Sequence, residues 1–424
     1  MKCIIKRAAP CCLVFLLIIV VSAFASSPEQ AFRQSEREYI CSWISLASYP
    51  DRIGTVAQDE LRQYGWDIKP MTEKNAQTDA KFTLAVKQDA AGKKTTIVAI
   101  SGTSSMQDVK SDLNMHAIPF HEEDQGSQAV PLVHAGFNKY ANTVLNHSYE
   151  NKTIQEALQA TVSQSNSLIL TGHSLGGAVA VLIGARLLDS GLLPNQLQVL
   201  TFGAPAVGNS AFNTAYEKSL QLDRIVIQGD PVKNILQAVY GTYEQFNEKT
   251  QWKQNKNTQR FHHDMVVYVD AALRNYYDKK KAYEAFLGYK VPMDIIPEHT
   301  SNLYVMPATF ELDNAIASDK FYMIQAADDY LRYHIGGIIF GKTETVLLDD
   351  GIRRARQANC DYVLLRRYKG ERMRDANYDF CISLEEEIYD VQGNFITSRQ
   401  CMTHTTEMTP IEAVLYVTAM SSRK

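Results

Sequence analysis

The sequence has little net charge and no internal repeat or low-complexity tract. Its 43 Lys and Arg residues are nearly balanced by 47 Asp and Glu residues, which leaves a formal net charge of −4 and a pI near 6.2. Without a broad basic field, nucleic acid is excluded as a partner. With 424 residues, of which 45% are hydrophobic, the chain can bury the cores of two domains, or of one domain with a large appendage.

Cysteine is scarce and is not grouped as metal sites require. Of the seven cysteines, four follow the first 25 residues, and none of these shows the C-x-x-C spacing typical of zinc sites: Cys41, Cys360, Cys381 and Cys401. The cysteine spacing therefore predicts no zinc site, and we expect no other metal ion or cofactor. In an oxidising compartment these residues form structural disulfides or remain as buried free thiols.

One cysteine pair lies on two neighbouring predicted strands. The segments 378–389 and 395–403 flank Gly393, and a three-residue loop there sets residue 381 opposite residue 403. Cys401 then lies on the same face, diagonal to Cys381, and a bulge would bring the two sulfurs within bonding reach. We therefore expect a disulfide between Cys381 and Cys401.

Long apolar runs are also lacking. The longest, Cys11 to Val21, falls short of the roughly 20 residues that span a bilayer comfortably. It follows the cationic residues Lys2, Lys6 and Arg7 and precedes the small-residue site Ala23-Phe24-Ala25, a pattern typical of a cleaved secretory signal. We expect the mature chain to begin near Ser26 and to act in the periplasm or outside the cell.

The body of the chain alternates between short apolar runs and helical stretches. Strands are predicted at 82–86, 95–100, 167–171, 198–202 and 224–228, with helices at 136–145 and 177–188. This alternation is typical of a mostly parallel sheet covered by helices. The sequence thus predicts a signal at 1–25, an α/β domain at 26–290, a proline-containing linker at 291–301 and a smaller α+β domain at 302–424.

One motif in the α/β domain carries chemistry. Gly172-His173-Ser174-Leu175-Gly176 fits G-x-S-x-G, and it stands between an apolar strand and a helix. In that setting a strained turn presents the serine hydroxyl at the top of the sheet, and the glycines remove side chains that would collide there. Ser174 is therefore the predicted nucleophile.

A serine hydroxyl needs a base, and the base needs a carboxylate. Asp230 follows the predicted strand 224–228 at its carboxyl end, whereas the competing Asp223 lies at the other end. Only His262 and His263 follow Asp230 within the α/β domain, so one of them is the candidate base. The developing oxyanion needs two backbone N–H donors, which we assign to Leu175 and, after strand 95–100, to Thr103.

Four blocks of the sequence together resemble the class 3 lipases, the family of fungal-type triacylglycerol lipases. They are Ser101-Gly102-Thr103 with Asp112-Leu113 downstream, Val133 to Phe137, Gly172 to Gly177, and Thr201 to Asn209. The resemblance covers about residues 30 to 275 and implies an α/β-hydrolase fold without a cofactor. It places the nucleophile on Ser174, the acid on Asp230, the oxyanion residues on Thr103 and Leu175, and the base on His263, with His262 as the alternative.

The resemblance also implies a function. We expect a serine carboxylic-ester hydrolase acting on acylglycerols, phospholipids or smaller esters at a lipid surface, with residues 106–126 either a lid or an ordinary surface loop. The alternative is a non-catalytic envelope protein that uses the hydrolase fold as an interaction platform. Beyond residue 300 the resemblance ends and no motif carries chemistry. An accessory role, in docking to an envelope component or in contact with a lipid surface, is a hypothesis for the C-terminal domain.

Overall fold

The computed structural model describes most of the chain. The described residues are 26–75, 78–102, 116–121, 130–162, 166–232, 242–246, 249–256, 260–292, 299–342, 347–374 and 379–422. The predicted signal at 1–25 and Thr103 lie outside these residues. Within them, no helix is long and apolar enough to cross a membrane.

A mostly parallel sheet forms the centre of the first domain. Its seven strands run in the order β1-β2-β3-β8-β9-β10-β11, and the ladders from β3 to β11 are parallel whereas β1, β2 and β3 pair antiparallel. The strands are β1 (Asp67–Asn75), β2 (Thr78–Gln88), β3 (Lys94–Ile100), β8 (Ser167–His173), β9 (Leu197–Phe202), β10 (Gln221–Ile227) and β11 (Thr250–Trp252). This agrees with the α/β-hydrolase class expected from the sequence.

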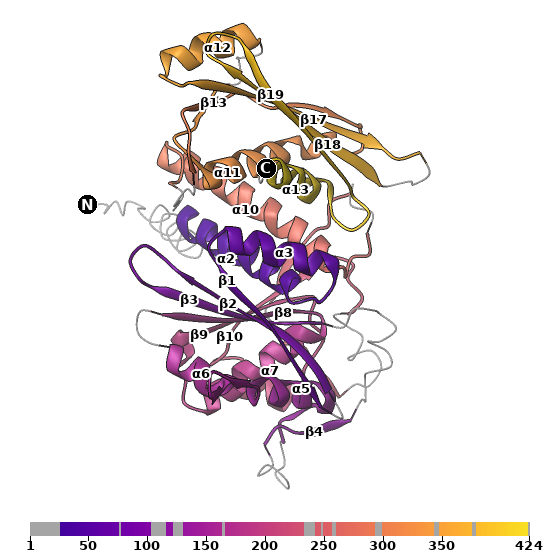
Figure 1. The fold of residues 1–424 in the computed structure, drawn as a ribbon. Coiled ribbons are helices and arrows are strands. Elements are labelled where there is room, and N and C mark those ends of the chain that lie inside the picture. Colours follow the sequence, from indigo (N-terminus) through magenta and orange to yellow (C-terminus); the bar gives the residue numbers. More distant parts are fainter. Residues whose placement is uncertain are drawn as a thin grey trace, which may run out of the picture.

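Helices cover both faces of this sheet (Figure 1). On one face α5 (Ala135–Leu145), α6 (Ile154–Thr161) and α7 (Leu175–Asp189) enclose the larger apolar core. On the other face lie α2 (Pro28–Ala47), α3 (Arg52–Gln63) and α10 (Met265–Leu287). The smaller elements are β4 (Ala117–Pro119), β5 (Leu132–His134), β6 (Ser148–Tyr149), β7 (Lys152–Thr153), the 3-10 turn η2 (Pro194–Gln196) and α8 (Ser210–Tyr216).

A second sheet stands beyond these helices. Its strands run in the order β16-β13-β17-β18-β19, with β14 also paired to β17. The strands are β13 (Leu303–Val305), β14 (Thr309–Leu312), β16 (Ile339–Phe340), β17 (Tyr362–Arg372), β18 (Phe380–Asp390) and β19 (Phe395–His404). Helices α11 (Lys320–His334) and α13 (Pro410–Ser422) separate it from α10, and α12 (Leu348–Gln357) packs at its far end (Figure 1).

The second domain is α+β, as expected, but the sequence analysis missed one of its central helices. α13 is buried along most of its length between α11 and the second sheet. A helix that is apolar all round lacks the 3.6-residue periodicity by which amphipathic helices are recognised. The boundary at 291–301 stays a prediction: 293–298 lie outside the described residues, and β12 (His299–Thr300) pairs with β15 (Ile335–Gly336).

The expected disulfide between Cys381 and Cys401 is wrong. All four cysteines of the described residues are free thiols. In the ladder, Cys381 lies opposite His404 and Cys401 lies opposite Leu384, three residues further along β18. Three strand residues correspond to about 10 Å, and an odd separation points the two side chains to opposite faces.

The cause of this error is the position of a bulge. The loop itself has the expected form, because the N–H of Asp390 donates to the carbonyl of Asn394 over 3.0 Å and Gly393 has a φ of 95°. Between Ile388 and Tyr389, however, the register shifts by one residue. A one-residue shift moves every later side chain to the other face, so this bulge separates the cysteines instead of joining them.

Candidate active site

Ser174 occupies a sharp turn between β8 and α7. Its backbone has φ 56° and ψ −129°, a conformation that is strained for a residue with a side chain. The N–H of Ser174 donates to the carbonyl of Phe202 over 2.9 Å, which ties the turn to the end of β9. Because the turn reverses so abruptly, the serine side chain leaves the strand end and faces the neighbouring loops.

The two glycines of the motif make this turn possible. A Cβ on Gly176 would lie 2.1 Å from the carbonyl oxygen of Ile100 in β3, and a Cβ on Gly172 would lie 2.5 Å from the backbone of Gly176. Both collisions are with backbone atoms, which cannot swing aside as a side chain can. Only glycine therefore allows α7 to approach β3 and β8 this closely.

Ser174, His263 and Asp230 form a continuous chain of hydrogen-bond contacts. Nε2 of His263 lies 2.8 Å from Oγ of Ser174, and Nδ1 of His263 lies 2.8 Å from Oδ2 of Asp230. Since an ionised carboxylate only accepts, Nδ1 carries the proton and Nε2 accepts from the serine hydroxyl. All three residues are buried, with exposed fractions of 2%, 6% and 1%.

Each partner is brought to the serine by the end of a different element. Asp230 follows β10 across Gly229, whose φ is 94°, and its second carboxylate oxygen, Oδ1, accepts from the N–H of Val232 over 2.8 Å. His263 stands two residues before the first residue of α10, Met265. The carboxyl ends of parallel strands share one edge of the sheet, so residues far apart in sequence meet there.

The alternatives left open by the sequence are placed elsewhere. His262 is exposed, and its ring lies over Gly229 instead of facing the serine. Asp223 lies within β10 near its amino end, where its carboxylate accepts from Gln34 and Gln198. Of the two histidines, the structure therefore brings His263 to Ser174; its catalytic role stays a prediction.

Two residues that support the carboxylate were not found by sequence reasoning. The hydroxyl of Tyr268 donates to Oδ2 of Asp230 over 2.5 Å and accepts from the N–H of Ile227 over 3.2 Å. Burial, followed by the charge of Asp230, raises the pKa of Tyr268 well above its usual value, so this phenol stays a donor. At Gly203, with φ 59°, a Cβ would lie 2.8 Å from Oδ2 of Asp230, so glycine leaves room for the carboxylate.

His173, the second residue of the motif, contacts the backbone of the candidate base His263. Its Nε2 lies 2.7 Å from the carbonyl oxygen of His263, and its Nδ1 lies 2.7 Å from the hydroxyl of Tyr49 in the turn after α2. A carbonyl only accepts, so Nε2 is protonated and Nδ1 accepts from the tyrosine. Burial lowers the pKa of His173 well below its usual value and keeps this tautomer neutral.

The region for an oxyanion is described in part. Leu175 is the first residue of α7, where a backbone N–H has no partner within the helix and points outward from its positive end. Thr103 lies outside the described residues, but its neighbour Gly102 approaches the site closely: a Cβ there would lie 3.3 Å from Cβ of Ser174. The residues assigned to the oxyanion stay a prediction.

Of the segment 106–126, only residues 116–121 are described. Ala117–Pro119 form strand β4, which pairs with β5, and Phe120 is buried at 3% exposure in the larger core. Whether the remainder acts as a lid stays a prediction. Among the residues the structure describes, no group of three or more His, Cys, Asp or Glu side chains is arranged to hold a metal ion.

A parallel sheet, a strained serine turn and a Ser–His–Asp chain at the strand ends together define the α/β-hydrolase class. Residues 97–239 match the family model described as lipase (class 3). Over this segment, about a third of its length, the chain is similar to the class 3 lipases.

Curated relatives match part of the chain. The chain is 37% identical over 98 residues to a lipase of Caenorhabditis elegans, a match that covers 22% of this chain and 28% of the relative. It is 32% identical over 151 residues to a lipase of Rhizopus niveus, covering 35% and 36%. It is 28% identical over 168 residues to a chloroplastic phospholipase A(1) of Arabidopsis thaliana, covering 37% of each chain. The chain thus spans only about a third of the length of these relatives.

Proposed function

We propose that this protein is a serine carboxylic-ester hydrolase that acts on lipid esters. The observation that carries the proposal is the buried contact chain from Ser174 through His263 to Asp230, formed at a strained turn. Strain of this kind persists only where the surrounding structure enforces it, and it is common at reactive serines. The class 3 lipase match over 97–239 and the relatives named as lipases and phospholipase support the same activity.

In the proposed mechanism, Ser174 Oγ attacks the ester carbonyl while Nε2 of His263 takes the hydroxyl proton. Asp230 holds the proton on Nδ1 and stabilises the imidazolium that forms. The N–H groups of Leu175 and Thr103 bind the negative oxygen of the tetrahedral intermediate. His263 then protonates the departing alcohol, which leaves an acyl group on Ser174. A water molecule, activated by the same histidine, releases the acid and restores the serine.

A panel of p-nitrophenyl esters tests the substrate class. We expect the palmitate ester, presented as an emulsion, to be hydrolysed faster than the dissolved acetate ester, because the proposed substrate is a lipid surface. Release of fatty acid from phosphatidylcholine vesicles measures phospholipase activity in parallel, and a Ser174→Ala variant is the blank. Turnover of short, soluble esters alone would contradict the proposal that the substrates are lipid esters. The protein would then be a general carboxylesterase.

The alternative is a non-catalytic interaction protein on the same scaffold. A fluorophosphonate probe separates the two, because covalent labelling requires an activated serine. Labelling of the wild-type chain, but not of Ser174→Ala, supports the hydrolase. Docking of the C-terminal domain to an envelope component stays a prediction.

We also propose that the chain is exported and acts in the periplasm or outside the cell, on the pattern of its first 25 residues. Intact-mass measurement of protein recovered from an expressing bacterium should show loss of these residues and a mature chain beginning near Ser26. An uncleaved chain retained in the cytoplasm would contradict export. Loss of the signal without export of the chain would equally argue against the proposed location.

A further inference from the structure

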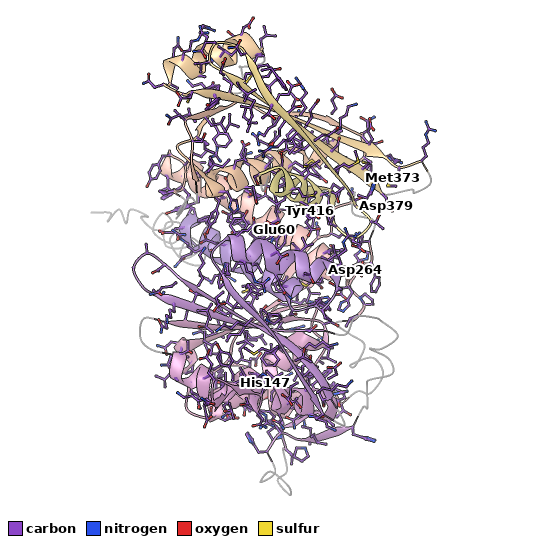
Figure 2. All side chains as sticks on the ribbon, in the orientation of Figure 1. Glu60, His147, Asp264, Met373, Asp379 and Tyr416 are labelled. Carbon is purple, nitrogen blue, oxygen red and sulfur yellow. The ribbon has the colours of Figure 1, made fainter. Side chains whose placement is uncertain are left out.

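Helix α10 belongs to the cores of both domains, and His263 lies directly before it. The first turns of α10, Met265 to Ala271, pack into the apolar core between the first sheet and helices α2 and α3. Further along, Leu273 and Tyr277 lie in the core formed by α11, α13 and the second sheet. Figure 2 shows Asp264, the residue after His263, at the level where the two domains meet. The candidate base therefore stands at the domain junction.

The backbone before His263 forms a tight turn. The N–H of Asp264 donates to the carbonyl of Phe261 over 2.9 Å, which closes the turn around the histidine. The carbonyl of Arg260 accepts from the side-chain amide of Gln254 over 2.9 Å, so the start of the turn is tied to the preceding loop. The position of residue 260 therefore bears directly on the position of the imidazole three residues later.

The side chain of Arg260 holds this turn against the second domain. Its Nη2 donates to the backbone carbonyl of Thr405 over 2.8 Å and also to that of Thr406. Thr405 is buried and bound to the first residue of β18, because its N–H donates to the carbonyl of Phe380 and its hydroxyl accepts from the N–H of Phe380. The guanidinium is thus bonded to backbone that the second sheet holds in place.

A second contact holds the same loop on its other side. The amide of Asn255 donates to Oδ1 of Asp319 over 2.9 Å, and Asp319 is buried at the start of α11. The same oxygen also accepts from Arg274 of α10 over 3.0 Å. Residues on both sides of the loop are therefore fastened to the second domain, one through Arg260 and one through Asn255.

We propose that the second domain is part of the catalytic apparatus and that Arg260 is a positioning residue for His263. This inference rests on the proposed hydrolase function. The imidazole must face the serine hydroxyl and the carboxylate at the same time, and a misplacement of about 1 Å in such a group can cost about a hundred-fold in rate. Arg260 touches none of the reacting groups; it acts by fixing the turn that carries the base.

The test compares steady-state kinetics of full-length variants on p-nitrophenyl butyrate. For Arg260→Ala we expect kcat to fall by about ten- to a hundred-fold, with KM within about three-fold of wild type. The substitution changes the position of the His263 imidazole, but it does not change the site that binds the acyl group of the substrate. The midpoint of thermal unfolding should remain close to that of wild type. Guanidinium ion at low, non-denaturing concentration should restore part of the kcat of Arg260→Ala. The kcat of Arg260→Lys should lie between those of Arg260→Ala and the wild type.

The matched control is Arg52→Ala. Like Arg260, Arg52 contacts the connection between β19 and α13, where it lies 3.8 Å from Glu407. Both side chains of this ion pair are exposed, and Arg52 belongs to α3 and not to the turn that carries His263. This variant should keep the wild-type kcat. Equal losses in Arg52→Ala and Arg260→Ala would overturn the proposal, since they would show a general effect of charge at the junction.

Other outcomes also test the positioning role of Arg260. An Arg260→Ala variant with wild-type kcat contradicts a positioning role, and so does a loss of kcat that follows a loss of folded protein and responds to neither lysine nor guanidinium. If the alanine variant does not fold, Arg260→Lys carries the test, with a reduced kcat expected at an unchanged unfolding midpoint. Wild-type protein without turnover or fluorophosphonate labelling would instead contradict the proposed function itself.

Discussion

Replacement of Ser174 by alanine is expected to abolish ester hydrolysis, with kcat reduced by about a million-fold, because removal of the nucleophile from a triad disables the whole unit. The fold should survive. Alanine occupies the same backbone conformation at φ 56° with the same strain, and the N–H bond to Phe202 does not involve the side chain. Turnover of a p-nitrophenyl ester and the midpoint of thermal unfolding, measured on the same preparation, check both parts.

Ser45→Ala is the matched control for this variant. Ser45 is a buried serine on α2 whose hydroxyl lies 3.1 Å from that of Thr171 in β8, but it has no contact with His263. It should retain wild-type turnover and fluorophosphonate labelling. A Ser174→Ala protein that kept even a tenth of the wild-type rate would show that another residue is the nucleophile.

The second large effect is expected at the adjacent histidines. His263→Ala should lose activity about as completely as Ser174→Ala, because the members of a triad act together and their losses do not add. His262→Ala should retain turnover within about three-fold, since its exposed ring lies over Gly229 and does not contact the serine. The pair forms its own control, because the two substitutions are chemically identical and one residue apart.

Steady-state kinetics of both variants, with circular dichroism to verify folding, make this comparison. The opposite pattern, an inactive His262→Ala and an active His263→Ala, would move the base by one residue. Loss of activity in both variants with intact folding would argue that His262 holds the turn around Gly229 in addition to the role proposed for His263.

Local patterns in the sequence predicted the strands and the helix around the serine motif of the first domain, but not helices α2, α3 and α10. The apolar strands at 95–100 and 167–171 appear as β3 and β8, and the helix after the motif appears as α7. These elements are short, apolar and bounded by turn residues, so the strand pattern and the turn chemistry agree. The sequence likewise identified Ser174, Asp230 and the pair His262 and His263 as candidates, because each follows or precedes an element with a clear pattern.

Features that depend on strand register or on packing between distant segments could not be predicted from the sequence. A bulge at Ile388 and Tyr389 decides which face Cys381 occupies, and nothing in the local pattern marks its place. The uniformly apolar α13 gave no periodic signal. The sequence analysis also gave no signal for Tyr268, whose hydroxyl donates to the carboxylate of Asp230.

By itself, the sequence determined the fold class of the first domain, the strained turn at Ser174 and the candidate partners of that serine. These depend on residues close together in the chain, where side-chain size and backbone freedom act directly. Only the tertiary structure showed that the ring of His263 faces Ser174, and only it placed the hydroxyl of Tyr49 against His173 and the guanidinium of Arg260 against Thr405. Such contacts join segments tens to hundreds of residues apart, and their geometry exists only once helices and sheets have packed.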